Sequence, residues 1–385
     1  MKKTLIISVI ILVVILILPG IGFFGWFFKE KKPIDVIILN KTVHSLDRVK
    51  HRALHWVLTN DRFVKENKRK YYLRKDYYGF YPVKPVRSKQ FRRNDYRLTE
   101  LIDLADNNDA LYYADTYGVF FNDWYQGINR SRRSRKLYGG LNNNDYLLLS
   151  EMQKRNKLTI LEYNTIDYPT DAYERYRVEE LVGFKSTGWT GQYYCSLDSA
   201  SSCVPVWMPG LYKKKTRQPW EFKNPGIVLL KGENEIIVLE EGKHLANALP
   251  FIITGPDEAS KYGLAVQVPF DKPFDIIEPR DNVVFSSFEL MITEEGDELL
   301  DRHFLTPQFP AVIVKPGDLR SVYFCGDFAS SQIPPWTACF GSLNILKSLL
   351  YKEDDLNDTR RFFWQYYKPL LSGMLDNYYL ELENK

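Results

Sequence analysis

Short apolar runs alternate with stretches of helical periodicity over residues 34–183, and this alternation limits the fold more than any other feature. The apolar runs are rich in β-branched or aromatic residues; they are 34–39 (IDVIIL), 110–114 (ALYYA) and 158–163 (LTILEY). Between them, apolar side chains recur three or four residues apart, as in helices; these stretches are 46–58, 98–104, 145–155 and 170–182. Strands that alternate with helices predict a mostly parallel sheet with helical crossovers, so we expect an α/β fold.

The pattern changes after residue 183, where strand-like runs follow one another directly. These runs are 227–230, 236–239, 251–254, 264–268, 283–292, 311–314 and 322–325. Turn residues at 231–234 and 315–318 predict two hairpins. With 385 residues, 45% of them hydrophobic, the chain can form one large domain or two ordinary ones. The expected divisions are a membrane anchor with its flank (1–32), an α/β domain (33–183), a β-rich continuation or second subdomain (184–340) and C-terminal helices (341–385).

The chain begins with an uncharged segment, from Thr4 to Phe28, that is long enough to cross a membrane. At about 1.5 Å per residue its 25 residues span roughly 37 Å, and a hydrocarbon core is about 30 Å thick. A cleaved signal peptide is the alternative. The apolar run is longer than the usual signal core and no A-x-A site follows it, while Trp26 beside Lys29 is typical of an interfacial anchor. We therefore expect a single uncleaved membrane helix.

Charge and cysteines give opposing indications of orientation. Lysines flank both ends of the apolar segment and weakly favour a cytoplasmic body. The spacing of Cys195 with Cys203, and of Cys325 with Cys339, suits two local disulfides, which persist only in an oxidising compartment. Four free thiols remain the alternative. Because large domains can translocate despite flanking lysines, we expect a bacterial inner-membrane protein with an extracytoplasmic body.

Residues 62–93 form a basic segment with twelve lysines or arginines against two acids, in a chain whose net charge is +4. Six tyrosines or phenylalanines are interleaved with these charges between residues 71 and 81. Such a pattern can bind single-stranded nucleic acid, but beside a membrane anchor it more often meets anionic lipid or glycan. A solvated loop without a ligand is the simplest reading. Nucleic acid is not an expected partner.

The strand ends of the α/β part carry the strongest candidates for a site. In open parallel sheets ligands bind beyond the carboxyl ends of the strands. Asp115 and Thr116 end one strand there, and Glu162 and Asn164 end the next. Two carboxylates at one edge can divide acid and base roles. Alternatively, Glu162 forms a structural ion pair.

Two further stretches could contribute to the same crevice. The loop 129–136 (NRSRRSRK), which contains Arg132 and Arg133, precedes Gly139 and Gly140 and would offer an anion site if it folds over the strand ends. A mobile charged loop is the alternative. The run 188–194 (GWTGQYY), with Trp189 and Gly191, suits stacking on a sugar or a tight turn into a strand.

Motifs for metal or nucleophilic chemistry are weak. His51 and His55 lie one helical turn apart and are weak metal candidates, because no third ligand accompanies them. The sequence has no P-loop, no GxGxxG after a strand, no GxSxG, and no cysteine in a G-x-C-x-G elbow. We expect no cofactor.

The order of sequence blocks carries a resemblance. The blocks are KKPIDVIILNKTV (31–43), an H-x-x-x-H-W helix (51–56), LYYADTYGV (111–119), LYGGL (137–141), TILEYNT (159–165), STGWTGQYY (186–194) and KNPGIVLL (223–230). The set resembles a family of bacterial single-pass membrane proteins whose soluble part is similar to the class I glutamine amidotransferase-like fold. The resemblance implies a flavodoxin-like three-layer sandwich. It also implies a Cys-His-Glu triad, from which this sequence departs because the corresponding places hold no cysteine.

Residues that match these blocks are the ligand-site candidates, and Asp327 joins them because it ends another strand-like run. They are Asp115, Thr116, Tyr117, Gly139, Gly140, Glu162, Asn164, Trp189 and Gly191. The expected function is a membrane-anchored, non-catalytic module that binds an anionic, small or glycan ligand. One alternative is a hydrolase that uses Asp115 and Glu162 on an envelope glycan or amide. Another is a structural partner of other proteins in an envelope assembly or export complex.

Overall fold

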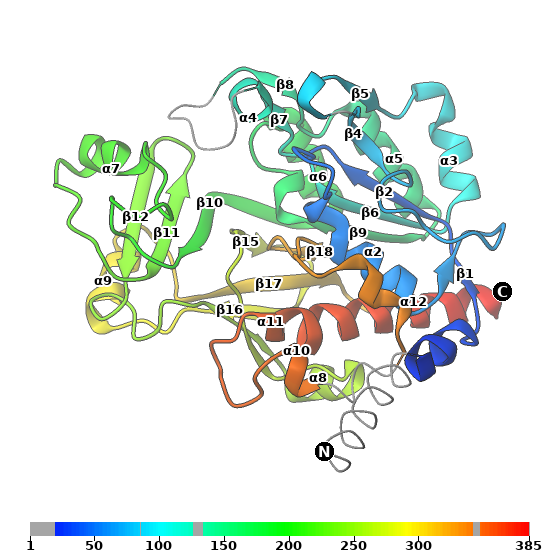
Figure 1. Ribbon diagram of the computed structural model, residues 1–385. Coiled ribbons are helices and arrows are strands. Elements are labelled where there is room, and N and C mark those ends of the chain that lie inside the picture. The colour runs from blue at the N-terminus through cyan, green and yellow to red at the C-terminus, as the bar shows by residue number, and fades with distance from the viewer. Residues whose placement is uncertain (1–19, 85, 126–133, 342–346, 385) are drawn as a thin grey trace, which may run out of the picture.

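A mixed ten-stranded sheet forms the centre of the protein (Figure 1). The computed structural model describes residues 20–84, 86–125, 134–341 and 347–384. In spatial order the sheet consists of β14 (Gln267–Pro269), β13 (Phe251–Thr254), β16 (Val283–Glu289), β17 (Gln308–Lys315), β18 (Asp318–Phe324), β9 (Leu158–Glu162), β6 (Ala110–Asp115), β2 (Val36–Asn40), β4 (Tyr78–Pro82) and β5 (Phe91–Asn94). Strands from both the α/β part and the β-rich part therefore share one sheet.

Parallel pairing is confined to the middle of this sheet. β18, β9, β6, β2 and β4 are parallel to one another, whereas the five remaining pairings, at both ends, are antiparallel. The expected α/β architecture is present, but the expectation of a mostly parallel sheet is corrected to a mixed one. The reason is that β17–β18 is a hairpin whose second strand pairs with β9, so that a run of antiparallel strands extends the parallel set.

Helices cover both faces of the central sheet (Figure 1). On one face α5 (Asn143–Lys154) lies between α3 (Leu101–Asn107) and α6 (Ala172–Val182), contacts both, and packs on β6 and β9. On the other face α2 (Arg52–Asn60) packs against α12 (Lys368–Glu383), which also contacts α8 (Pro256–Tyr262). The other helical segments are η1 (Val49–His51), η2 (Val86–Ser88), η3 (Leu98–Glu100), α4 (Phe121–Tyr125), η4 (Tyr163–Thr165), α7 (Met208–Thr216), α9 (Glu294–Asp301), η5 (Pro335–Cys339), α10 (Lys347–Leu350), α11 (Arg360–Phe362) and the π-helical η7 (Phe363–Tyr367).

A four-stranded antiparallel sheet projects from one end of the molecule (Figure 1). It contains β12 (Glu235–Glu240), β11 (Gly226–Lys231), β10 (Phe184–Tyr194) and β15 (Phe274–Pro279), in that order. Two further two-stranded pairs are β1 (Lys32–Pro33) with β3 (Phe63–Val64), and β7 (Val119–Phe120) with β8 (Lys136–Tyr138). Both hairpins expected from turn residues are present, as β11–β12 and β17–β18.

The basic segment 62–93 contributes β4 and β5 to the central sheet, and most of its aromatic side chains pack on the core, whereas Tyr72 is exposed. Tyr71, Tyr77 and Phe80 are buried, and the Tyr71 hydroxyl donates to the Ile34 carbonyl at 2.6 Å. Most of these aromatics therefore serve the core and cannot stack on nucleotide bases.

The expected membrane helix lies largely outside the described residues. Residues 20–27 are helical, and among the residues that the structure describes no helix is both long and apolar enough to cross a membrane.

The cysteines differ from the expected two disulfides. Cys195 and Cys203 are joined, but Cys325 and Cys339 are both free thiols. Cys325 follows β18 in the sheet core, where its backbone bonds to Ala311 and Asp275, whereas Cys339 belongs to η5 on the outer side of α2. Cys325 and Cys339 are thus close in sequence, but they lie in different parts of the fold and form no disulfide.

Candidate functional site

The carboxyl ends of four parallel strands bring polar side chains to one edge of the sheet. Asn40 ends β2, Asp115 ends β6, Glu162 ends β9, and Asp327 follows β18. All four side chains are buried. Because burying polar groups is costly unless they find partners, their contacts decide what this edge can do.

Asp115 is held on both of its oxygens. Oδ1 accepts from the Thr42 hydroxyl and from the Tyr117 backbone N–H at 2.8 Å, and Oδ2 accepts from the Asn164 side chain at 3.0 Å. The Lys50 ammonium lies 3.3 Å from Oδ2. The expected neighbour of Asp115 was Glu162, but the side chain from that strand end that binds Asp115 directly is Asn164.

Lys50 joins Asp115 to Asp327, and we call these three residues the strand-end cluster. The Lys50 Nζ lies 2.5 Å from Asp327 Oδ2, and the lysine side chain remains 23% exposed. Burial alone would lower the pKa of Lys50, but the charges of Asp327 and Asp115 outweigh it and raise the pKa well above its ordinary value. The second oxygen of Asp327, Oδ1, is buried and accepts no hydrogen bond from the described part of the chain.

Glu162 forms hydrogen bonds within the protein through both of its carboxyl oxygens. Its Oε1 accepts from the Tyr112 hydroxyl at 2.5 Å and from the Ala329 N–H at 2.9 Å, and its Oε2 accepts from the Phe328 N–H at 2.9 Å. Burial, and then the charge of Asp327, raise the pKa of Glu162 well above its ordinary value. Glu162 therefore fastens the loop after β18 to the end of β9. The carboxylate that shares a partner with Asp115 is Asp327.

Thr116, Gly139 and Gly140 hold neighbouring loops together around the cluster. The Thr116 hydroxyl lies 2.9 Å from the Asn164 carbonyl, and the Gly140 N–H donates to the Thr116 carbonyl at 2.6 Å. A Cβ on Gly139, whose φ is +141°, would lie 2.5 Å from the Tyr117 carbonyl. The glycines thus permit backbone-to-backbone packing, not the approach of a ligand. Arg132 and Arg133 lie outside the described residues.

An aromatic group borders the cluster. The Tyr117 ring lies 4.9 Å from the Phe120 ring and 6.5 Å from the Tyr168 ring, and Tyr168 is 38% exposed. The backbone N–H of Tyr117 donates to Asp115, so the chain that carries this ring starts at the cluster. Aromatic faces beside hydrogen-bonding groups are typical of sugar-binding sites.

A buried ion pair joins two of the segments near the cluster, the loop after β2 and the start of α5. The Lys41 Nζ lies 2.5 Å from Asp145 Oδ2 and 3.0 Å from the Gly140 carbonyl, and both charged side chains are only 2% exposed. Asp145 also completes the capping box of α5 with Asn142. The pair therefore fixes the loop after β2 to the start of α5.

The two candidate metal-binding histidines do not form a metal site. The His51 Nδ1 lies 2.6 Å from the Asn40 side-chain nitrogen, and its Nε2 lies 3.1 Å from the Leu73 carbonyl. Burial lowers the pKa of both His51 and His55 to about 3, so both rings are neutral. Over the described ranges, no group of three or more histidine, cysteine or acidic side chains could hold a metal ion. The helical spacing of the histidines reflects packing, because both face the interior.

Trp189 and Gly191 lie in the four-stranded sheet and not at the strand-end cluster. Both belong to β10, where Trp189 pairs with Lys231 of β11 and Ile276 of β15. The Trp189 ring is buried and meets the His303 ring edge-on at 5.6 Å. This tryptophan is a core residue and offers no exposed face to a sugar.

Gly191 is required by close packing, and Gly191→Ala should be destabilising. The added Cβ would lie 2.3 Å from the Phe274 ring and 2.8 Å from a Leu229 methyl group. Overpacking of this kind costs about 1–3 kcal/mol, so we expect a loss of that size in the free energy of unfolding measured with urea. Gly210→Ala, in helix α7, is the control for the loss of a glycine, since its Cβ would meet nothing within 4 Å and its backbone φ is not in the left-handed region. Equal losses in both variants would contradict the packing role.

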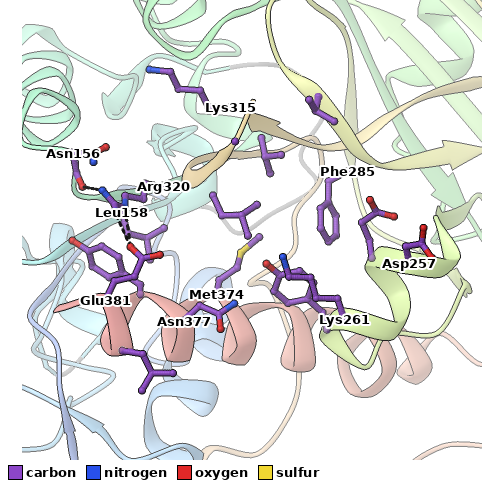
Figure 2. A pocket seen from close by; sticks show the side chains of 18 of the residues that line it. Asn156, Leu158, Asp257, Lys261, Phe285, Lys315, Arg320, Met374, Asn377 and Glu381 are labelled. Carbon is purple, nitrogen blue, oxygen red and sulfur yellow. Dashed lines mark hydrogen bonds and ion pairs between the residues drawn. The ribbon is translucent and has the colours of Figure 1, made fainter. Parts of the chain in front are cut away.

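A cavity lies at the opposite edge of the sheet (Figure 2). Its volume is about 870 Å³, and it lies between α8, α12 and the turn of the β17–β18 hairpin. Arg320 and Glu381 form an ion pair across one end at 2.5 Å, while Phe285 and Met374 contribute apolar surface. Because this cavity lies at the amino ends of the parallel strands, none of the strand-end candidates lines it.

Lys50, Thr42 and Lys272 were missed by sequence reasoning. Lys50 lies in η1, in the connection that follows β2. Such a connection begins at the carboxyl edge of the sheet, where ligands bind in open α/β sheets. That position is the signal that could have identified it. Lys272 donates to the Ser330 carbonyl, and burial lowers its pKa despite the nearby Asp327. No sequence pattern marks Lys272, because it comes from a distant loop.

Comparison with known proteins adds one distant structural likeness. No protein-family model matches the sequence, and no curated protein matches it. A solved structure of a ThuA-like protein from Bacteroides uniformis aligns with 84% of this chain and 95% of its own, at 9% identity and a TM-score of 0.35. A likeness at this TM-score assigns neither a family nor a function.

Proposed function

We propose that the protein is a membrane-attached envelope protein that binds a glycan at the strand-end cluster. The observation that carries this proposal is the buried Asp327 Oδ1, which accepts no hydrogen bond from the described residues, beside the partly exposed Lys50. A buried carboxylate oxygen without a partner needs an O–H or N–H donor from outside the described chain, and we propose that a ligand supplies it.

The composition of the cluster favours a neutral glycan over a polyanion. Two carboxylates surround one ammonium, so a strongly anionic ligand would meet net negative charge at the base of the site. Sugar hydroxyl groups can donate to Asp327 and accept from Lys50, while Tyr117 and Tyr168 border the cluster with aromatic surface. Most basic residues of 129–136 lie outside the described part of the chain. The proposal therefore includes no contact between them and an anionic group on the glycan.

Binding is better supported than hydrolysis at this edge. Both Glu162 oxygens accept hydrogen bonds, from the Phe328 and Ala329 N–H groups and the Tyr112 hydroxyl, and the side chain is fully buried, so Glu162 serves the fold and does not face a ligand. Asp115 and Asp327 are held by the same Lys50 Nζ. A paired-carboxylate hydrolase needs two carboxyl groups that face a substrate independently.

Location at the envelope is part of the proposal. The uncharged run from Thr4 to Phe28 supports attachment to the bacterial inner membrane, and the disulfide between Cys195 and Cys203 supports an oxidising, extracytoplasmic environment for the body.

Asp327→Asn tests the binding site. The full chain, in detergent, is applied to a glycan array, and the affinity for the best glycan is then measured by calorimetry. Hydrogen bonds to charged groups contribute about 1.5–3 kcal/mol, so the variant should bind at least tenfold more weakly. Asp257→Asn is the matched control, because it makes the same chemical change on the cavity at the opposite edge. Absence of any glycan ligand, or equal affinity in both variants, would overturn the proposal.

A further inference from the structure

Residues 20–28 present an apolar face to solvent. Over residues 20–27 the chain is helical, and Phe28, at its end, is 78% exposed. Several other large apolar side chains of this segment are also exposed; they are Ile21, Phe23, Phe24 and Phe27. Exposed apolar clusters of this kind mark surfaces that contact a partner or a membrane.

This helix is attached to the body by specific contacts. The Trp26 indole N–H donates to the Thr59 carbonyl at 2.9 Å, and the Arg62 guanidinium lies 4.7 Å from the centre of the Trp26 ring. The Gly341 N–H donates to the Gly22 carbonyl at 2.9 Å, an approach that the small residues permit, since a Cβ on Gly22 would lie 3.3 Å from the Gly341 carbonyl. The helix is therefore part of the domain surface.

The apolar face continues onto the segment before Gly341. Phe340 touches the helix at Gly22, and the Trp336 ring, 67% exposed, meets the Phe340 ring edge-on at 5.9 Å. We call residues 21, 23, 24, 27, 28 and 336 the aromatic face.

Basic residues border the aromatic face. Lys29 and Lys31 follow the helix closely, with the exposed Glu30 between them; Lys29 pairs with Asp61 at 2.8 Å, and Lys31 is exposed. The Arg62 guanidinium lies 4.7 Å from the Trp26 ring centre and 5.8 Å from the Phe27 ring centre, so it borders the same helix. Such a rim complements the phosphates of anionic lipids, and aromatic side chains favour the interface between headgroups and acyl chains.

We propose that the aromatic face docks on the lipid surface and holds the domain against the membrane in a fixed orientation. The inference rests on the membrane attachment in the proposed function and adds which face is buried. Lipid is favoured over a protein partner because the face is continuous in sequence with the uncharged run that begins at Thr4, and because its rim is basic.

The fold then determines the direction in which the strand-end cluster points. The helix leads into β1 and contacts the end of α2 at Thr59, which lies at the amino edge of the parallel strands. Asp115 ends β6 at the carboxyl edge, and a six-residue strand spans about 20 Å. The cluster therefore faces away from the membrane, towards the aqueous compartment.

Depth-dependent quenching tests the docking. The full chain with Cys339→Ser is reconstituted in vesicles of phosphatidylethanolamine and phosphatidylglycerol, and a fluorescent label is placed through Trp336→Cys or, separately, through Phe28→Cys. A third label, through Val206→Cys, is the control, because Val206 is exposed beside α7 at the far end of the molecule (Figure 1). Nitroxide-bearing lipids should quench the labels at 336 and 28 several times more strongly than the label at 206.

Each other outcome overturns the inference in a distinguishable way. Vesicle-bound protein with equal or no quenching at all three labels would leave the membrane attachment in place and refute the docking face. Protein that does not bind vesicles would refute both. Shielding of the labels at 336 and 28 without lipid, together with dimers in sedimentation, would assign the face to a second copy of the chain.

Discussion

Replacement of Lys50 by Met is expected to lower the free energy of unfolding by about 3–5 kcal/mol at neutral pH. The ammonium lies 2.5 Å from Asp327 and 3.3 Å from Asp115, and both carboxylates are almost fully buried. Without it, two like charges remain close together with little solvent. Urea denaturation of the full chain measures the loss, and Lys315→Met, at an exposed lysine, should change stability by much less.

The pH dependence of the Lys50 variant provides a second measurement. In the wild type the raised pKa of Lys50 means that its stabilising contribution is present below its unfolded-state pKa and is lost as the pH rises through the folded-state pKa. In Lys50→Met the two buried carboxylates repel each other without their cation, so the stability deficit of the variant should be largest at neutral pH and smaller under acidic conditions. Lys50→Met with Asp327→Asn should recover part of the loss. If Lys50→Met lowers the free energy of unfolding no more than Lys315→Met does, the contacts of Lys50 with Asp115 and Asp327 have no role in stability.

Wild-type protein should lose stability relative to Asp275→Asn as the pH is raised from about 5 to about 8, by about 2–3 kcal/mol. Burial raises the pKa of Asp275 to about 7, although the Tyr323 hydroxyl donates to its Oδ2 at 2.5 Å. Oδ1 is buried and accepts no hydrogen bond within the described chain. Because the folded-state pKa lies above the unfolded-state value, folded protein holds a proton that unfolded protein has released, and this advantage disappears as the pH rises through 7.

The test for Asp275 compares urea midpoints across that pH range. Comparison with Asp275→Asn removes the titrations that both proteins share, and Asp257→Asn on exposed α8 should follow the pH profile of the wild type. Parallel profiles for the wild type and Asp275→Asn would show that the carboxyl is not protonated in the folded protein. An Asn at 275 can still accept from Tyr323, so the variant should fold.

The strand ends were predictable because hydrophobic runs end abruptly at polar residues. Asp115 and Asn164 follow apolar runs on consecutive strands, and their hydrogen bond follows from the parallel pairing of β6 with β9. Asp327 lies at the same edge for the same reason. Whether these residues bind a ligand stays a prediction, and the anchor and the basic loop residues Arg132 and Arg133 lie outside the described part of the chain.

The rest depended on long-range packing that local patterns do not contain. The sequence could not show that β18 pairs with β9. It therefore could not show that Glu162 would accept hydrogen bonds from the Phe328 and Ala329 backbone N–H groups. The run 188–194 allowed either a sugar-stacking surface or a turn into a strand; it lies within β10, where Gly191 makes room for the Phe274 ring. β4 and β5 were hidden in the basic segment, since their charges face outward while Tyr77 and Phe80 fill the core.

The interleaving of the two sequence halves in one sheet determines how the chain can be divided. β18, from the later half, covers the edge of β9, and Glu162 binds the loop that follows β18. A fragment ending near Gly183 would expose the unpaired backbone of β9, a hydrophobic strand, and uncovered edges of this kind recruit other chains and aggregate. Neither half is therefore an autonomous folding unit, and new termini or fusions are best placed in the projecting sheet, around the β11–β12 turn.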